Sequence, residues 1–260
     1  MSEGKRKRRL MDVYEPVVEN AQLRPLIIWI HGGGFRFGSK KSRGIPIWSK
    51  SFARRGYVSV AINFRKSKIS GLRDFKALAR GCYTALEDLE QVVAWCKKNQ
   101  QKLKIDTGKI ILAGNSAGGM LALQAVYSGY ADLARIAEME NIPEPSEYNF
   151  MNIAGVVNFW GAVYDSTSLQ RVKVPIVSVH GTEDKIVPYY QIGIHVYGSG
   201  IIHRQADVYG IPNRLKTYEG LAHELQKPFH PFLFGAKAKR RWLEAGQFAA
   251  DFLYEEVVSK

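Results

Sequence analysis

The residues best suited to chemistry lie at 114–118, where the chain reads Gly-Asn-Ser-Ala-Gly. The apolar run Ile110–Ala113 predicts a short buried strand before them, and apolar residues from 121 to 126 predict a helix after them. A Gly-x-Ser-x-Gly turn between a strand and a helix presents its serine in a strained, exposed conformation. A serine hydroxyl attacks a carbonyl once a base removes its proton and a third group orients that base. We therefore predict that Ser116 is a catalytic nucleophile.

The base is expected on a loop at the same edge of the sheet, after the acid in the chain. His223 follows a short predicted strand at 214–218 directly, and Gly220 permits a tight loop between them. We predict His223 as the base. The other downstream histidines are His195, His203 and His230, of which His203 and His230 stand in weaker contexts.

The acid is predicted to be Asp184. It lies just beyond the predicted strand Val174–His180, where a carboxylate would emerge toward the serine. Asp165, beyond a predicted strand that ends at Trp160, is the competing candidate. Glu183 is adjacent to Asp184, but its side chain is expected to point elsewhere.

A serine nucleophile also needs backbone N–H groups aimed at the negative charge that develops on the carbonyl oxygen. The apolar run Leu26–Ile30 ends in residues 31–34, which read His-Gly-Gly-Gly. Glycines let the backbone approach a substrate without obstruction by side chains. A plain tight turn is the alternative, but the serine turn independently requires such a loop at this place. We expect the N–H of Ala117, the residue after the nucleophile, to complete the oxyanion hole.

Strands alternate with helices along the chain, which predicts an α/β fold. The ranges that predict strands are 10–16, 26–30, 57–64, 110–113, 153–160, 174–180 and 214–218, and those that predict helices are 45–55, 74–99 and 238–257. We expect a mostly parallel central sheet with helices on both faces and a small or absent cap. Residues 10–257 are predicted to form a single domain. Residues 130–150, with a helical segment from Asp132 to Glu140, are the candidate for a small lid.

Composition is that of an ordinary globular protein, with 46% hydrophobic and 23% charged residues in 260. No apolar stretch approaches the roughly 18 residues that span a membrane. The leader at 1–9 is basic and predicted to be disordered, and it has no apolar segment behind it, so no intact signal peptide is expected. The protein would then be cytoplasmic, or secreted with its signal removed.

The two cysteines, Cys82 and Cys96, fall in one predicted helix. At about 1.5 Å per residue their Cα atoms would lie about 21 Å apart, whereas a disulfide tolerates no more than about 7 Å. We predict two unpaired thiols.

The formal net charge is +13, from 37 Lys and Arg against 24 Asp and Glu. Basic runs at 5–9 and 237–241 could bind nucleic acid or an anionic surface. Neither run belongs to a nucleic-acid-binding module with interleaved aromatic residues. A solvated basic surface is the preferred interpretation, with no nucleic-acid partner expected.

Taken together, residues 31–35, 114–119, 180–188 and 220–224 resemble the α/β-hydrolase superfamily. More narrowly, they resemble its carboxylesterases and hormone-sensitive-lipase-like esterases, and the resemblance spans about residues 10 to 255. It implies that the N–H groups of Gly33 and Gly34 join Ala117 in the oxyanion hole, and that no metal or cofactor takes part. The residues expected near the pocket are His31, Phe35, Asn115 and Trp160.

The resemblance implies a carboxylesterase-type serine hydrolase that acts on a small-molecule ester through an acyl-enzyme. Larger esterases of this family carry a substantial N-terminal cap, whereas few residues precede the strand at Leu26 here. An open site suited to small or exposed esters is therefore expected. A peptidase of the same superfamily and a non-catalytic binding protein with this fold are the alternatives. The acyl group, the alcohol and the oligomeric state are left open by the sequence.

Overall fold

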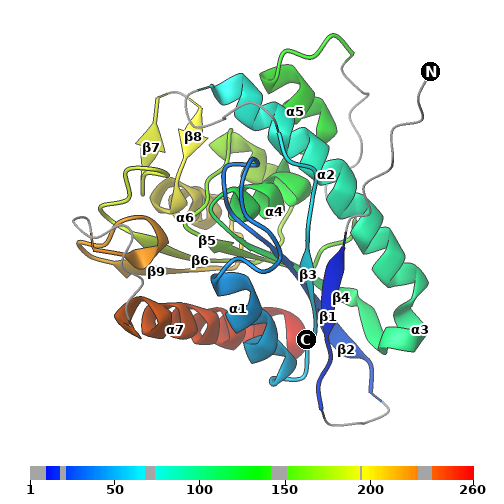
Figure 1. Cartoon of the computed structure of the whole chain (residues 1–260). Helices are drawn as coiled ribbons and strands as arrows, with labels where there is room; N and C mark the ends of the chain where they lie inside the picture. Colours follow the sequence, from blue (N-terminus) through cyan, green and yellow to red (C-terminus); the bar gives the residue numbers. More distant parts are fainter. Residues whose placement is uncertain (1–9, 18–21, 68–73, 142–150, 194, 228–235) are drawn as a thin grey trace.

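Seven strands form the sheet that positions the site, in the order β1-β3-β2-β4-β5-β6-β9 (Figure 1). The structure is a computed structural model, and it describes residues 10–17, 22–67, 74–141, 151–193, 195–227 and 236–260. The strands of this sheet are β1 (Met11–Tyr14), β2 (Arg24–Ile30), β3 (Val58–Ile62), β4 (Ile105–Asn115), β5 (Gly155–Phe159), β6 (Ile176–Gly181) and β9 (Asn213–Tyr218). Only β1 runs antiparallel to its neighbour within this sheet, so the predicted mostly parallel α/β sheet is confirmed.

Helices cover both faces of the sheet, which divides the apolar core into two clusters. The helices are α1 (Gly44–Ala53), α2 (Phe75–Lys98), α3 (Gln100–Leu103), α4 (Ala117–Tyr127), α5 (Tyr130–Ile136), α6 (Ser199–Val208) and α7 (Ala236–Leu253). Helices α1 and α7 lie on one side of the sheet, and α2, α4 and α6 lie on the other (Figure 1). The buried residues of the first pair belong to one cluster, and those of the second group belong to the other. The central strands are apolar along their length because both of their faces are covered.

The strand that leads to Ser116 is longer than the predicted run Ile110–Ala113. Pro25 of β2 pairs with Asp106, but the next residue, Leu26, pairs with Ile110, so residues 107–109 bulge out of the ladder. Asp106 Oδ1 accepts a hydrogen bond of 2.9 Å from the Gly108 N–H inside the bulge. Residues 107–109 therefore form an irregularity within one strand.

Helix α2 matches the predicted helix at 74–99, and Asp74 caps it by accepting from the Ala77 N–H at 3.1 Å. Cys82 and Cys96 both lie on α2, buried and unpaired, as predicted. The predicted helix at 132–140 is shorter than expected and ends at Ile136, because Glu138 takes a left-handed φ of +48°.

Several elements between β6 and β9 go beyond the predicted pattern. A short hairpin pairs β7 (Gln191–Ile192) with β8 (Val196–Tyr197), and α6 follows it. The leader at 1–9 and residues 142–150 of the candidate lid lie outside the described residues. Among the helices that the structure describes, none is long and apolar enough to cross a membrane.

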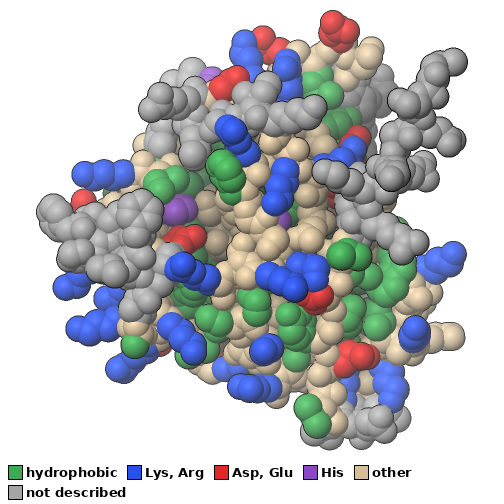
Figure 2. All heavy atoms as spheres, in the orientation of Figure 1, with side chains coloured by type: hydrophobic (Ala, Val, Ile, Leu, Met, Phe, Trp, Pro, Cys, Tyr) green, Lys and Arg blue, Asp and Glu red, His purple; other side chains and the backbone are tan. Residues whose placement is uncertain are grey.

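Lys and Arg side chains are spread over the face drawn in Figure 2 rather than gathered in one stripe. Within the basic run at 237–241, Arg240 pairs with Glu244 and Arg241 donates to the Leu225 carbonyl oxygen. Two residues of this run, Arg240 and Arg241, therefore make contacts within the chain.

Replacing Leu112 by alanine tests the central strand. Leu112 is fully buried on β4 between Ile28 and Val156, its partners on the two neighbouring strands. Leu112→Ala should lower the free energy of unfolding by about 2–5 kcal/mol, because it loses apolar burial and leaves a cavity. Urea unfolding measures this change. Val208→Ala on α6, at a side chain that is 71% exposed, is the control and should change it by no more than about 0.5 kcal/mol. Equal losses in the two variants would contradict the assignment of β4 to the core.

Candidate active site

Ser116 lies at the junction of β4 and α4 in a strained conformation. Its φ is +53°, a value that residues other than glycine rarely adopt. The Ser116 N–H donates to the Phe159 carbonyl oxygen at 2.8 Å, which ties the turn to the end of β5. A Cβ atom at Gly118 would clash with the carbonyl oxygen of Ile30, so only glycine allows the helix to start this close to β2. The turn therefore has the sharp geometry that its sequence predicts.

The structure brings Ser116 together with the predicted base and acid. His223 Nε2 lies 3.1 Å from Ser116 Oγ, and His223 Nδ1 lies 2.7 Å from Asp184 Oδ2. These are hydrogen-bond distances for a serine that donates to an imidazole whose other N–H donates to a carboxylate. The three side chains stand in the order that proton removal from Ser116 requires.

The carboxylate of Asp184 is fully buried yet well supplied with donors. Its Oδ1 accepts from the backbone N–H groups of Ile186 and Val187, both at 2.9 Å, while Oδ2 accepts from His223. Burial alone would raise the pKa of Asp184, but hydrogen bonds from His180 and His223 outweigh it and hold that pKa well below its usual range. Asp184 is therefore ionised at neutral pH.

Backbone contacts join the loop that carries the acid to the loop that carries the histidine. The Glu183 N–H donates to the Leu221 carbonyl oxygen at 2.9 Å, and the Gly220 N–H donates to Thr182 Oγ1 at 2.9 Å. The Glu183 side chain itself is exposed. Because the two loops follow the paired strands β6 and β9, these bonds fix the distance between acid and base.

Helix α7 holds the histidine loop from the other side, a contact that the sequence analysis missed. Glu224 and Leu225 both have a φ of +58°, and their carbonyl oxygens accept from Trp242 Nε1 at 2.9 Å and from Arg241 at 2.8 Å. Trp48 Nε1 in turn donates to the Trp242 carbonyl oxygen at 2.8 Å. In the sequence, this contact is indicated only by a tryptophan and an arginine, two side chains that donate hydrogen bonds, near the start of the C-terminal helix.

The glycine loop after β2 is attached to the serine turn. Asn115 Oδ1 accepts from the Gly32 N–H at 3.1 Å, and the carbonyl oxygen of Gly33 accepts from two following N–H groups. Gly33 has a φ of +112° and Gly34 one of +59°. Within the described part of the chain, the N–H groups of Gly33 and Gly34 have no acceptor. Ala117 is the first residue of α4, where an N–H has no acceptor within the helix.

His31 lies beneath the glycine loop and is not a base for Ser116. Its Nδ1–H donates to the Gly32 carbonyl oxygen at 2.7 Å, and its ring stacks on Phe64 with 4.3 Å between the centroids. Nε2 is buried and has no hydrogen-bond partner among the described residues. Burial lowers the pKa of His31 to about 4, and the charge of Lys66 acts in the same direction. The ring is therefore neutral at pH 7 and supports the loop.

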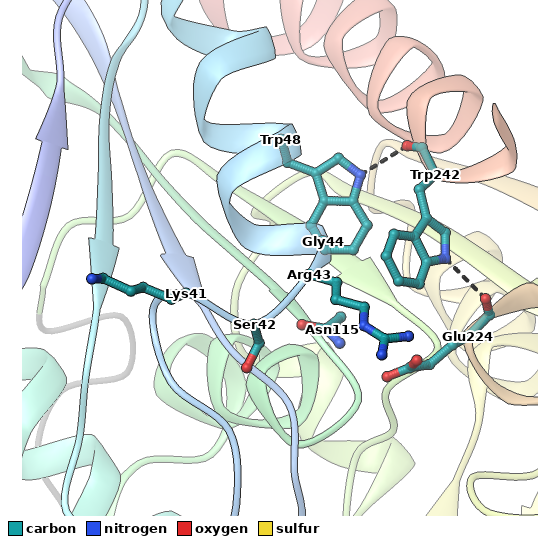
Figure 3. Close-up of a pocket in the computed structure, with 8 residues that line it drawn as sticks. All are labelled: Lys41, Ser42, Arg43, Gly44, Trp48, Asn115, Glu224 and Trp242. Atoms are coloured by element: carbon teal, nitrogen blue, oxygen red, sulfur yellow. Dashed lines mark hydrogen bonds between the residues drawn. The ribbon is translucent and has the colours of Figure 1, made fainter. Parts of the chain in front are cut away.

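A pocket of about 360 Å³ opens beside the site, between residues that neighbour Ser116 and His223 in the chain (Figure 3). Its lining residues are Lys41, Ser42, Arg43, Gly44, Trp48, Asn115, Glu224 and Trp242. The guanidinium of Arg43 and the carboxyl of Glu224 point toward one another, while Lys41 extends away from them (Figure 3). Burial raises the pKa of Glu224, although the charges of His223 and Arg43 oppose that shift.

Of the four residues expected near the pocket, Asn115 lines this one. The other three, His31, Phe35 and Trp160, are fully buried and are not among its lining residues. Trp160 packs against Trp48 with 5.9 Å between ring centroids, and Phe35 packs at the same distance against Phe64. These aromatic side chains contribute to the core on which the site is built.

The competing candidates lie elsewhere. Asp165 caps a 3₁₀ turn at Ser166–Arg171 by accepting from the Thr167 N–H at 2.8 Å. His203 Nδ1 lies 2.6 Å from Asn213 Oδ1, and His195 is exposed and stacks on Phe75. His230 lies outside the described residues. Among the described residues, no group of three or more His, Cys, Asp or Glu side chains is arranged to hold a metal ion.

A mostly parallel sheet with helices on both faces and a Gly-x-Ser-x-Gly turn after a central strand defines the chain as an α/β-hydrolase. The family model named BD-FAE matches residues 11–173, more than half of the chain, and the chain belongs to that family.

Relatives and solved structures agree with this class. Venom carboxylesterase-6 of Apis mellifera is 32% identical over 110 residues, which cover 42% of this chain and 19% of that protein. Gut esterase 1 of Caenorhabditis elegans is 26% identical over 112 residues, which cover 43% of this chain and 20% of that protein. The chain thus matches about a fifth of the length of these curated relatives.

The structure of Thermogutta terrifontis esterase 2 phosphorylated by paraoxon is similar to this one with a TM-score of 0.68. The match covers 98% of this chain and 91% of that chain at 21% sequence identity. At this level of identity the likeness establishes the fold.

His31→Asn tests whether His31 is buried as a neutral ring. The unfolded chain takes up a proton on His31 near pH 6.5, but the folded protein does so only near pH 4. The neutral, buried His31 ring therefore makes its full contribution to the free energy of unfolding above pH 6.5, and that contribution is lost as the pH falls through 4. An asparagine can keep the donor to Gly32 without titrating.

The free energy of unfolding of the parent, relative to His31→Asn, should therefore fall by about 3 kcal/mol between pH 7 and pH 4. Urea unfolding of both proteins at several pH values measures this difference, in which the other titrating groups cancel. A difference that does not change with pH would contradict the neutral, buried state of His31.

Proposed function

We propose that this protein is a serine carboxylic-ester hydrolase that works through an acyl-enzyme. The observation that carries the proposal is the hydrogen-bonded series from Ser116 Oγ to His223 at 3.1 Å and from His223 to Asp184 at 2.7 Å. The esterase names of the relatives support it, as does a structural neighbour that is an esterase phosphorylated by paraoxon.

In the proposed reaction, Ser116 Oγ attacks the ester carbonyl carbon while His223 Nε2 takes its proton. Asp184 keeps Nδ1 of the imidazole protonated and stabilises the imidazolium that forms. His223 then donates the proton to the departing alcohol, which leaves the acyl group on Ser116. Water attacks the acyl-enzyme with His223 as base again, and the acid is released.

The negative oxygen of the tetrahedral intermediate would lie against the N–H groups of Gly33, Gly34 and Ala117. None of these three groups donates to another acceptor within the described residues, which leaves them free for such an oxyanion. Removal of one donor of this kind typically costs about 10²–10³-fold in kcat. The residues with proposed roles come from the loop after β2, the turn between β4 and α4, and the loops after β6 and β9, so we propose that residues 10–257 act as a single catalytic domain.

The substrates we propose are small or exposed esters. The pocket beside Ser116 is bordered by Arg43, Glu224 and Asn115, whose polar groups an alkyl chain would remove from water. Short acyl groups avoid this cost because they leave the far part of the pocket hydrated.

Ser116→Ala should abolish both the hydrolysis of p-nitrophenyl acetate and labelling by a fluorophosphonate probe, because the attacking oxygen is missing. Release of p-nitrophenol and gel fluorescence of the labelled protein measure the two effects. Ser128→Ala, at a buried serine near the end of α4, is the matched control and should keep both activities. Hydrolysis retained by Ser116→Ala would refute the proposed mechanism.

A series of p-nitrophenyl esters tests the proposed substrate class. Acetate and butyrate should have a kcat/KM at least about tenfold above that of decanoate, since the longer chain covers the polar border of the pocket. Arg43→Leu makes that border more apolar and should narrow the ratio by raising the rate on decanoate. Equal kcat/KM values for butyrate and decanoate in the parent would count against small esters as the substrate class.

A further inference from the structure

A second histidine, His180, lies at the end of β6 behind the acid, and the proposed reaction does not use it. Its side chain is fully buried. Nε2 lies 2.8 Å from the Val187 carbonyl oxygen and 3.4 Å from Asp184 Oδ2, and Nδ1 lies 2.7 Å from Ser199 Oγ. Both ring nitrogens therefore have partners, and one partner is the carboxylate that holds His223.

The partners determine where the proton of a neutral His180 ring lies. A carbonyl oxygen only accepts, so Nε2 carries the hydrogen that points at Val187 and Asp184. Nδ1 of the neutral ring then accepts the hydroxyl hydrogen of Ser199. Ser199 Oγ accepts in turn from Asn158 Nδ2 at 3.3 Å. In this buried series each side chain donates to the next, from Asn158 to Ser199 and from Ser199 to His180, and the last donor points at Asp184.

His180 also fixes the turn that presents Asp184. The Val187 N–H donates to Asp184 Oδ1 at 2.9 Å, while the carbonyl oxygen of the same residue accepts from His180. Both the N–H and the carbonyl oxygen of Val187 are thus hydrogen-bonded. Together these bonds fix the plane of the Asp184 carboxylate. His223 donates to Oδ2 of that carboxylate, so a rotation of its plane would turn the His223 ring away from Ser116.

We propose that His180 is a positioning residue for the hydrolysis, one that aligns Asp184 and through it the His223 ring. The inference rests on the proposed function. A misplacement of about 1 Å between reacting groups can cost about 10²-fold in rate. Loss of the Nε2–H of His180 should therefore lower kcat and leave substrate binding largely unchanged, since His180 is shielded from the pocket by burial.

Two conservative variants separate this role from simple filling of space. In His180→Gln the amide nitrogen can reach the position of Nε2 and donate to Val187 and Asp184. In His180→Asn the amide nitrogen stands near the position of Nδ1 and faces Ser199 instead. With p-nitrophenyl acetate, His180→Asn should lose about 10²-fold in kcat, with KM changed by less than about threefold. His180→Gln should recover kcat to within about tenfold of the parent.

His203 provides the matched control, because it is also a buried histidine with a polar partner. His203 lies on α6, and its Nδ1 is 2.6 Å from Asn213 Oδ1. Among the described residues, Asp184 accepts side-chain hydrogen bonds from His180 and His223 and not from His203. His203→Gln and His203→Asn should lower the Tm and leave kcat near that of the parent. If His180→Asn is not recovered in a folded state, Ser199→Ala takes its place. It removes the hydroxyl that orients the His180 ring, and it should lower kcat by about tenfold.

The inference is overturned if His180→Asn keeps the kcat of the parent, if His180→Gln is as slow as His180→Asn, or if the losses in kcat follow the losses in Tm equally at both histidines. When Ser199→Ala replaces His180→Asn, an unchanged kcat overturns it as well. A parent protein that neither hydrolyses the ester nor reacts with a fluorophosphonate overturns the proposed function, and the inference with it. An active parent with a fully active His180→Asn variant overturns the inference alone.

Discussion

The structure of the site depends on one buried charge, the carboxylate of Asp184. An ionised carboxylate removed from water is costly unless donors surround it. Here Ile186 and Val187 supply two backbone N–H groups to one oxygen, and His223 supplies its Nδ1–H to the other. The same donors that compensate the burial also orient the acid, so the requirement for stability and the requirement for chemistry are met by the same bonds.

The remaining elements transmit this constraint to Ser116. The parallel pairing of β6 with β9 places the acid and histidine loops side by side, and helix α7 holds the histidine loop through Trp242 and Arg241. On the other side, β4 delivers Ser116 and the Asn115 amide ties the glycine loop to the same turn. Each group of the site therefore follows a different strand of one sheet, and the pairing of those strands sets the distances between the groups.

The sheet is predictable from the sequence because strands covered on both faces are continuous apolar runs, as in Leu26–Ile30. Ser116, Asp184 and His223 are predictable because each follows a predicted strand. The structure brings the three within hydrogen-bond distance, while their chemistry stays a prediction. The contacts of Trp242 and the hydrogen bonds of His180 are not predictable in this way, because they join residues far apart in the chain and depend on how helices pack. Likewise the bulge after Asp106 follows from the register of two strands, which no local pattern records.

The rate at which paraoxon modifies the protein is the sharpest test of the roles proposed for Ser116, His223 and Asp184, because this step needs a nucleophilic serine and no ester specificity. Intact-protein mass spectrometry with peptide mapping follows the adduct in the parent and in Asp184→Asn. We expect one adduct, on Ser116, that forms about 10⁴-fold more slowly in Asp184→Asn, since an amide cannot hold the His223 tautomer that accepts the serine proton. An adduct on another residue, or equal rates in the two proteins, would contradict these roles.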